Sequence, residues 1–142
     1  LGMSGVGKSS LCRRITHGDF EEPVSNIGCS FVRLKFNVFQ YFFTHSLAHS
    51  SNTFQFTHIT LEIWDTAGQE RYSSLAPIYY RGVSLIFLVF DLTDKKSFKA
   101  INGWLQQVLK SCSLQPIIIL IGNKDDLEHK REVSNEEINV CF

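Results

Sequence analysis

The chain has 142 residues, of which 44% are hydrophobic and 20% charged, and its 14 basic residues balance 14 acidic ones. This length fits a single domain with one core, and the neutral balance excludes proteins that bind nucleic acid or anionic lipid by charge alone. The two longest apolar stretches, 83–90 and 117–121, are far shorter than the roughly 18 residues of a membrane-spanning helix. Four widely spaced cysteines without a C-x-x-C pair favour reduced intracellular thiols.

The first ten residues, LGMSGVGKSS, contain the spacing G-x-x-x-x-G-K-S. This pattern is typical of a phosphate-binding loop between a strand and a helix, where backbone N–H groups and the positive end of the helix face one anion. We expect Lys8 to reach the terminal phosphates and the Ser9 hydroxyl to bind Mg²⁺. A glycine-rich turn before a helix is the alternative interpretation. Leu1 alone precedes the loop, and we expect it to be the last residue of a central strand.

Helical and strand-like patterns follow the loop. Residues 10–16 predict a helix that ends at Gly18. Residues 31–36 and 59–64 alternate apolar and polar side chains, as strands do. Residues 37–58 lie between them with no charged side chain and no clear period, so we interpret them as an atypical insertion between two strands.

The second half predicts two strands buried on both faces, over 83–90 and 117–121, with an amphipathic helix between them. Ser134 and Glu137 have the spacing of a capping box at the start of a last helix. Buried strands that alternate with amphipathic helices predict an α/β fold with a mostly parallel sheet. The apolar face of the helix between the strands is expected to comprise Phe98, Ile101, Trp104, Leu105, Val108 and Leu109.

A second motif, DTAGQE at 65–70, follows directly on a predicted strand. An aspartate at such a strand end can hold Mg²⁺, so this is the expected role of Asp65. Gly68 would let its N–H approach a γ-phosphate, and the Gln69 amide would orient an attacking water. A polar turn residue at a strand end is the alternative interpretation of Asp65.

A third motif, GNKDD at 122–126, follows the second buried strand. A carboxylate accepts two hydrogen bonds side by side, so Asp126 can pair with the N1–H and 2-amino group of guanine, a donor pair that adenine does not offer. A polar turn is the alternative for this stretch alone. Because ligands in α/β sheets bind at the carboxyl ends of the strands, the three motifs together predict one guanine-nucleotide site, and they disfavour a P-loop kinase or ATPase.

Together, G-x-x-x-x-G-K-S, W-D-T-A-G-Q-E and N-K-x-D resemble the Ras superfamily of small GTPases. WDTAGQERY at 64–72, YYRG at 79–82 and NKDDL at 123–127 resemble its Rab branch, and residues 27–31 and 74–82 are similar to endosomal Rabs. The resemblance implies a P-loop NTPase (Ras-like) α/β fold, with a mostly parallel sheet and helices on both faces. Residues 1–142 would form a single partial domain without the family's first strand, last strand and last helix.

The resemblance also implies a molecular switch that binds GTP or GDP with Mg²⁺ and hydrolyses GTP slowly to regulate vesicle trafficking. Its expected place is the cytosolic face of intracellular membranes, endosomes above all, held by a prenylated tail that this sequence does not include. The partners implied are guanine nucleotide, an exchange factor, a GAP, effector proteins and a dissociation inhibitor, with no nucleic acid.

Site roles follow from the same resemblance. Lys8 and Gln69 would be catalytic, and Ser9, Asp65 and Asn26 would hold the metal. Partner proteins would read Ile27, Phe31, Trp64, Tyr72 and Tyr79 as an apolar surface, with ordinary packing as the alternative. The nucleotide would be bound by Gly5, Val6, Gly7, Lys8, Ser9, Ser10, Phe20, Gly68, Asn123, Lys124 and Asp126.

Two departures from the family pattern stand out. Asn26 replaces the threonine that ligates Mg²⁺ in the first switch, and residues 37–58 lengthen a short hairpin. They favour one alternative to a working GTPase, a GTP-binding interaction module without useful turnover. A non-functional fragment is the other alternative, because the expected loss of the central first strand would remove sheet pairing and apolar burial. We also hypothesise that part of 37–58 is a gene-model error, which a transcript containing those codons in frame would contradict.

Overall fold

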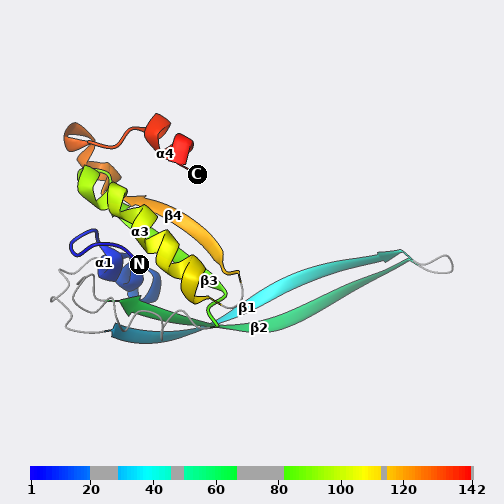
Figure 1. Cartoon of the computed structure of the whole chain (residues 1–142). Helices are drawn as coiled ribbons and strands as arrows, with labels where there is room; N and C mark the ends of the chain where they lie inside the picture. Colours follow the sequence, from blue (N-terminus) through cyan, green and yellow to red (C-terminus); the bar gives the residue numbers. More distant parts are fainter. Residues whose placement is uncertain (20–28, 46–49, 67–81, 113–114, 142) are drawn as a thin grey trace. The chain divides into compact units, whose positions relative to one another are not determined.

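The computed structural model describes residues 1–19, 29–45, 50–66, 82–112 and 115–141 (Figure 1). They form two compact units, one of Phe31–Trp64 and one of Leu1–Ser30 with Asp65–Phe142. The elements in chain order are α1 (Lys8–His17), β1 (Cys29–His45), β2 (Ser50–Thr66), β3 (Leu85–Asp91), α3 (Lys95–Ser111), β4 (Ile117–Asn123), the 3-10 helix η2 (Asp125–Lys130) and α4 (Asn135–Cys141). None of the described helices is long and apolar enough to cross a membrane.

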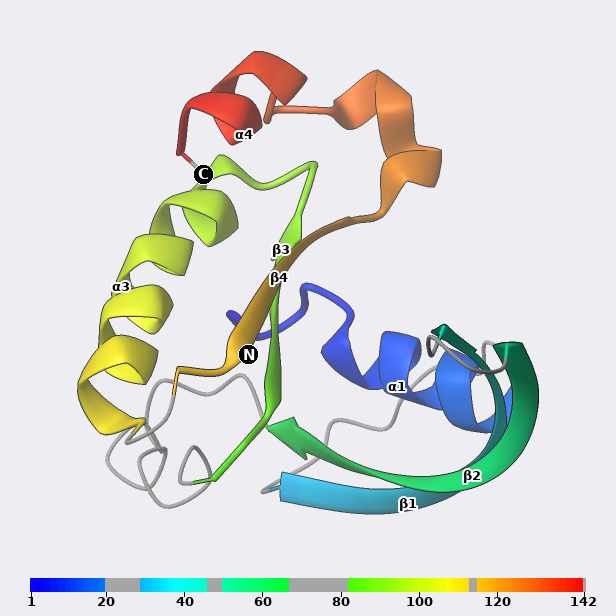
Figure 2. The same ribbon diagram turned by 90° about the vertical axis from the view of Figure 1, so that its right-hand side faces the viewer.

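The centre of the larger unit is the parallel pair β3–β4. Its register runs from Leu85 opposite Ile117 to Asp91 opposite Asn123, so both strands end at the same edge. In Figure 2, α3 lies on one side of this pair and α1 on the other. The predicted α/β fold with a parallel sheet is confirmed.

The core of this unit lies between β3 and α3. Leu88 and Phe90 are fully buried, and the Phe90 ring packs on Phe98 of α3 with centroids 4.9 Å apart. Ile101 and Val108 complete the buried face of the helix. The predicted apolar face is thus confirmed at these positions and wrong for Leu109, which is 54% exposed because it lies at the margin of that face.

The prediction that both strands are buried on both faces is confirmed for one face and only in part for the other. Side chains alternate along a strand, and α3 packs on the face that carries Leu88 and Phe90. The opposite face is only partly covered: Val89 is 3% exposed, whereas Phe87, Ile117 and Ile119 are exposed, Ile117 to 67%. The two continuous apolar runs therefore predicted the strands correctly but overstated how many of their side chains are buried.

Leu1 lies beside β3. Its amino nitrogen donates to the carbonyl of Phe87, and its carbonyl accepts from the N–H of Val89, both at 2.7 Å. This pair of bonds is the pattern of a parallel ladder around Leu88. The phosphate-loop motif therefore starts at the edge of β3.

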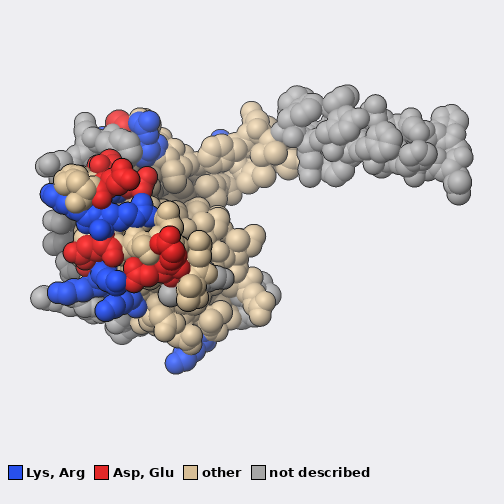
Figure 3. Space-filling model, turned by 90° about the horizontal axis from the view of Figure 1, so that it is seen from above, with Lys and Arg blue, Asp and Glu red and all other residues tan. Residues whose placement is uncertain are grey.

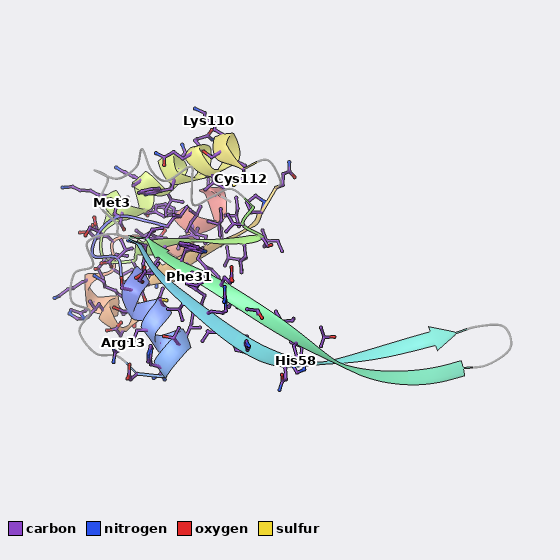
Figure 4. The ribbon with its side chains drawn as sticks, turned by 90° about the horizontal axis from the view of Figure 1, so that it is seen from below. Met3, Arg13, Phe31, His58, Lys110 and Cys112 are labelled. Atoms are coloured by element: carbon purple, nitrogen blue, oxygen red, sulfur yellow. The ribbon has the colours of Figure 1, made fainter. Side chains whose placement is uncertain are left out.

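The helix α1 confirms the helix predicted over 10–16 and its end. The N–H of Gly18, in the left-handed conformation with φ 77°, donates to the Arg14 carbonyl and closes the last turn. Arg13, on this helix in Figure 4, forms an exposed ion pair with Asp19 at 2.7 Å.

The predicted capping box at the start of α4 is also confirmed. The N–H of Glu137 donates to the Ser134 hydroxyl, and the N–H of Ser134 donates to the Glu137 carboxylate, both at 3.2 Å. Glu137 also pairs with Lys95 at the start of α3, at 2.6 Å. In Figure 3, Lys, Arg, Asp and Glu gather together over this end of the larger unit, so both signs of charge share that face.

The smaller unit is built from β1 and β2, strands of 17 residues each that form a two-stranded sheet. Three cross-strand pairs share one antiparallel register, because each step along β1 matches an equal step back along β2. They are Phe31–Trp64 with ring centroids 4.7 Å apart, Arg33–Glu62 at 2.5 Å, and Asn37–His58 at 2.6 Å. Figure 4 labels one residue of the first pair, Phe31, and one of the last, His58. The two strands continue into the uncharged segment, through residues 37–45 and 50–58.

Candidate functional site

The loop before α1 has the backbone that the phosphate-binding motif predicts. Gly5 and Gly7 adopt φ values of 80° and 93°, which L side chains rarely adopt, and Gly7 forms the N-terminal cap of α1. No side chain caps this helix end, and the first turn holds no acidic residue. The first N–H groups of α1 are thus left for an external acceptor, and Ser9 and Ser10 lie in this turn.

Lys8 folds back over the loop. Its Nζ donates to the carbonyls of Gly2 and Met3, at 2.9 and 2.7 Å. Burial lowers the pKa of Lys8, and the negative charge of Asp65 offsets part of this effect. An anion at the loop would act in the same direction as Asp65 and favour the charged ammonium.

The third motif meets the first through Asn123. Its Nδ2 donates to the Val6 carbonyl at 2.8 Å, across 117 positions of sequence, and Val6 is buried. A Cβ on Gly7 would lie 2.1 Å from the same Nδ2. Gly7 is therefore needed both for its backbone conformation and for the close approach of Asn123.

The rest of the third motif continues from the end of β4. Lys124 adopts φ 65°, and its Nζ pairs with Asp91 Oδ2 at 2.6 Å. Asp126 lies in η2 with its side chain exposed. The carboxylate predicted to read guanine is thus open to a ligand.

Asp65 is buried at the end of β2 and belongs to the same unit as Lys8, whose charge it stabilises. Mg²⁺ in proteins is usually held by one or two side-chain oxygens together with substrate phosphates and water, and the Ser9 hydroxyl and Asp65 carboxylate are oxygen donors of the right kind. Over the described ranges, no group of three or more His, Cys, Asp or Glu side chains is placed to hold a metal.

Several predicted site residues lie outside the described residues: Phe20, Asn26, Gly68 and Gln69, and with them Ile27, Tyr72 and Tyr79 of the predicted partner surface. The other two residues of that surface, Phe31 and Trp64, are both exposed and pack against each other in the smaller unit.

Asp91 was missed from the sequence. It is the last residue of β3 and is 6% exposed, and its Oδ1 accepts from the N–H and hydroxyl of Thr93 at 2.8 and 2.7 Å. Burial by itself would raise its pKa, but hydrogen bonds from Lys124 and Thr93 hold the pKa of Asp91 below its ordinary value. An aspartate at a strand end had marked Asp65, and the same signal was present at Asp91.

The Ras family model matches residues 1–141 of the chain. The chain is 43% identical to the Ras-related protein RHN1 of Nicotiana plumbaginifolia, and 41% identical to both the Ras-related protein Rab5 of Nicotiana tabacum and the Ras-related protein RABF2a of Arabidopsis thaliana. Each match covers 99% of this chain and 62% of the relative, so the chain spans less than two thirds of their length. The chain therefore belongs to the Ras family, as a Rab-type member.

Proposed function

We propose that this chain binds GTP and GDP at the carboxyl ends of β3 and β4 and works as a GTP-hydrolysing switch. The observation that carries the proposal is the hydrogen bond from Asn123 to the Val6 carbonyl. It joins the loop suited to phosphate to the loop suited to guanine, which lie far apart in the sequence. One ligand with a guanine base at one end and phosphates at the other fits this pair.

The roles of the residues follow from their chemistry. The N–H groups from Gly5 to Ser10 and the Lys8 ammonium would hold the phosphates, with Ser9, Asp65 and Asn26 as the oxygen donors for Mg²⁺. Asp126 would read the base, the Lys124 stem would lie along it, and Phe20 would pack against it. Mg²⁺ would supply charge neutralisation on the phosphates when bound.

Hydrolysis would proceed by in-line attack of a water molecule on the γ-phosphate. Gln69 would orient the water, the Gly68 N–H would bind a γ-phosphate oxygen, and Lys8 would take up charge that develops on the phosphates. A GAP is expected to accelerate the step.

We propose vesicle trafficking, with a lean toward endosomes, as the cellular role, because the relatives include proteins named Rab5 and RABF2a. The expected partners are an exchange factor, a GAP, effectors and a dissociation inhibitor, with the protein on the cytosolic face of membranes through a prenylated tail. The exposed Phe31–Trp64 pair is suited to an apolar contact with such proteins.

The test is a change of base specificity. With xanthine, an asparagine at position 126 would accept a hydrogen bond from N1–H and donate one to the 2-oxo group. With guanine, its side-chain NH₂ would meet the 2-amino group, and because both are donors they cannot form a hydrogen bond. Asp126→Asn should therefore weaken GDP binding and strengthen XDP binding in calorimetric titrations. Asp125→Asn, an adjacent exposed carboxylate with the same change of charge, is the control, and equal effects of both variants would contradict the proposal.

A nucleotide-binding module without turnover is the second candidate, favoured by Asn26 at the position of the family's Mg²⁺-binding threonine. Single-turnover hydrolysis of bound GTP, with and without a Rab GAP, separates the two. Intact binding with no acceleration would favour the module.

A further inference from the structure

We propose that Asp91 is a positioning residue for base recognition, which acts by fixing Lys124 through their ion pair. The inference rests on the proposed guanine-nucleotide site and adds a residue outside its three motifs. Lys124 stands between Asn123, which binds the Val6 carbonyl, and Asp126, the carboxylate suited to guanine. The conformation of Lys124 therefore sets the relative placement of the two ends of the site.

Lys124 needs such support because of its backbone. Its φ of 65° is the only positive value at a non-glycine residue in the described part of the chain. A residue in this sparsely populated region persists only when its surroundings hold it there. The 2.6 Å pair between Lys124 Nζ and Asp91 Oδ2 is the side-chain contact that does so.

Asp91 is itself held from several directions. Its Oδ1 is occupied by the N–H and hydroxyl of Thr93, which leaves Oδ2 for Lys124. Its backbone N–H donates to the Ser97 hydroxyl at 2.9 Å. The next residue, Leu92, donates its N–H to the Asn123 carbonyl at 3.0 Å. The turn after β3 thus braces the loop after β4 through both backbone and side chain.

The pairing has two consequences for a bound base. The ion pair fixes the end of the four-carbon stem of Lys124, which would give the base a fixed surface to lie on. The Lys124 ammonium is also neutralised by Asp91, so it does not compete with guanine for the nearby Asp126 carboxylate. Without Asp91, guanine would meet a mobile lysine and a partly neutralised Asp126.

The experiment measures release of a fluorescent methylanthraniloyl-GDP from the purified protein by stopped flow. Asp91→Asn keeps the size of the side chain and the acceptor for Thr93 but removes the charge, and it should speed release by about tenfold, the change expected for one charge-assisted hydrogen bond. Asp94→Asn makes the same change of charge three residues later, at the cap of α3, and should leave release unchanged. Equal rates for Asp91→Asn and the unaltered protein would overturn the inference.

A double variant separates positioning from a general loss of structure. In a Lys124→Met background, Asp91→Asn should add little further acceleration, because the pair is already broken, whereas the same tenfold effect in both backgrounds would overturn the inference. Thr93→Val removes the hydroxyl bond to Oδ1 but keeps the bond from the backbone N–H and the charge of Asp91, so it should give a smaller acceleration. This variant serves if Asp91→Asn fails to fold, and no change in the release rate there would also contradict the proposal. Failure of the unaltered protein to bind the probe would instead refute the proposed nucleotide site.

Discussion

The apolar strands of the two units differ in how far their side chains are buried. In the larger unit, α3 covers one face of β3–β4, and Leu88 and Phe90 are fully buried. In the smaller unit, β1 and β2 pair only with each other among the described residues, and Phe36 is 44% exposed. The comparison shows that burial of an apolar strand depends on a covering element, which the strand's own residues do not supply.

The same contrast extends to charged side chains. Asp91 is buried at a strand end with its partners in place, whereas Glu62 pairs with Arg33 on an exposed surface. The candidate nucleotide-site residues that the structure describes belong to the larger unit, where packed elements hold them in position. A rigid, covered sheet edge can keep a charged residue in one geometry, and an uncovered two-stranded sheet cannot do so as firmly.

The largest expected effect is on stability, and it compares a buried ring of the larger unit with a partly exposed ring of the smaller unit. Phe90→Ala removes a fully buried ring that packs on Phe98 and should lower the free energy of unfolding by about 3–5 kcal/mol. Phe36→Ala, the matched change in the smaller unit, should lower it by less, by about 1 kcal/mol, because that residue is already 44% exposed in the folded chain. Urea unfolding followed by circular dichroism measures both, and similar losses would contradict the contrast.

The next effect tests the close approach of the two motif loops. Gly7→Ala places a Cβ 2.1 Å from Asn123 Nδ2 at a residue with φ 93°, and strain and overpacking together should lower the free energy of unfolding by about 2–4 kcal/mol. Affinity for GDP should fall as well. Gly18→Ala has a similar φ of 77° but open space around its Cβ, so it isolates the strain. A Gly18→Ala loss as large as that of Gly7→Ala would mean that the contact with Asn123 is unimportant.

Local patterns made most of this fold predictable from the sequence. The end of α1 at Gly18, the Ser134–Glu137 capping box and the parallel strands depend on nearby residues or on periodicity, and all are confirmed. The exposed face of β4 was not predictable, because it depends on which helix covers which side.

The candidate site, too, was predictable from the sequence only in part. The motifs predicted that the phosphate loop before α1 and the loop after β4 lie close together, and the hydrogen bond from Asn123 to the Val6 carbonyl joins them. The partnership of Asp91 with Lys124 was missed, because it joins two strand ends 33 positions apart and neither residue forms a recognisable motif with the other. The extension of β1 and β2 through residues 37–45 and 50–58 was likewise not predicted, because that segment has no clear period.

A smaller effect concerns pH and the Asp91–Lys124 pair. The pKa of Asp91 in the folded chain is lowered from 3.8, so its contribution to stability is complete above that value and is lost as the pH falls through the folded pKa. At pH 7, Asp91→Asn should lower the free energy of unfolding by about 1–3 kcal/mol, since a charge-assisted hydrogen bond is lost. The difference between the two proteins should shrink as the pH falls below 3.8 in urea titrations. A difference that stays constant down to acid pH would show that the Asp91 charge does not stabilise the fold.

The smallest effect belongs to the corresponding pair of the smaller unit. Arg33 and Glu62 lie 2.5 Å apart but are both about half exposed, so solvent and salt screen their attraction. A double-mutant cycle with Arg33→Met and Glu62→Gln should give a coupling energy of about 0.2–1 kcal/mol, which falls as sodium chloride is raised. The same cycle on Asp91 and Lys124 should give a larger coupling that salt changes less, because Asp91 is buried. If the Arg33–Glu62 coupling equalled that of the buried pair at high salt, exposure would not be what distinguishes the two units.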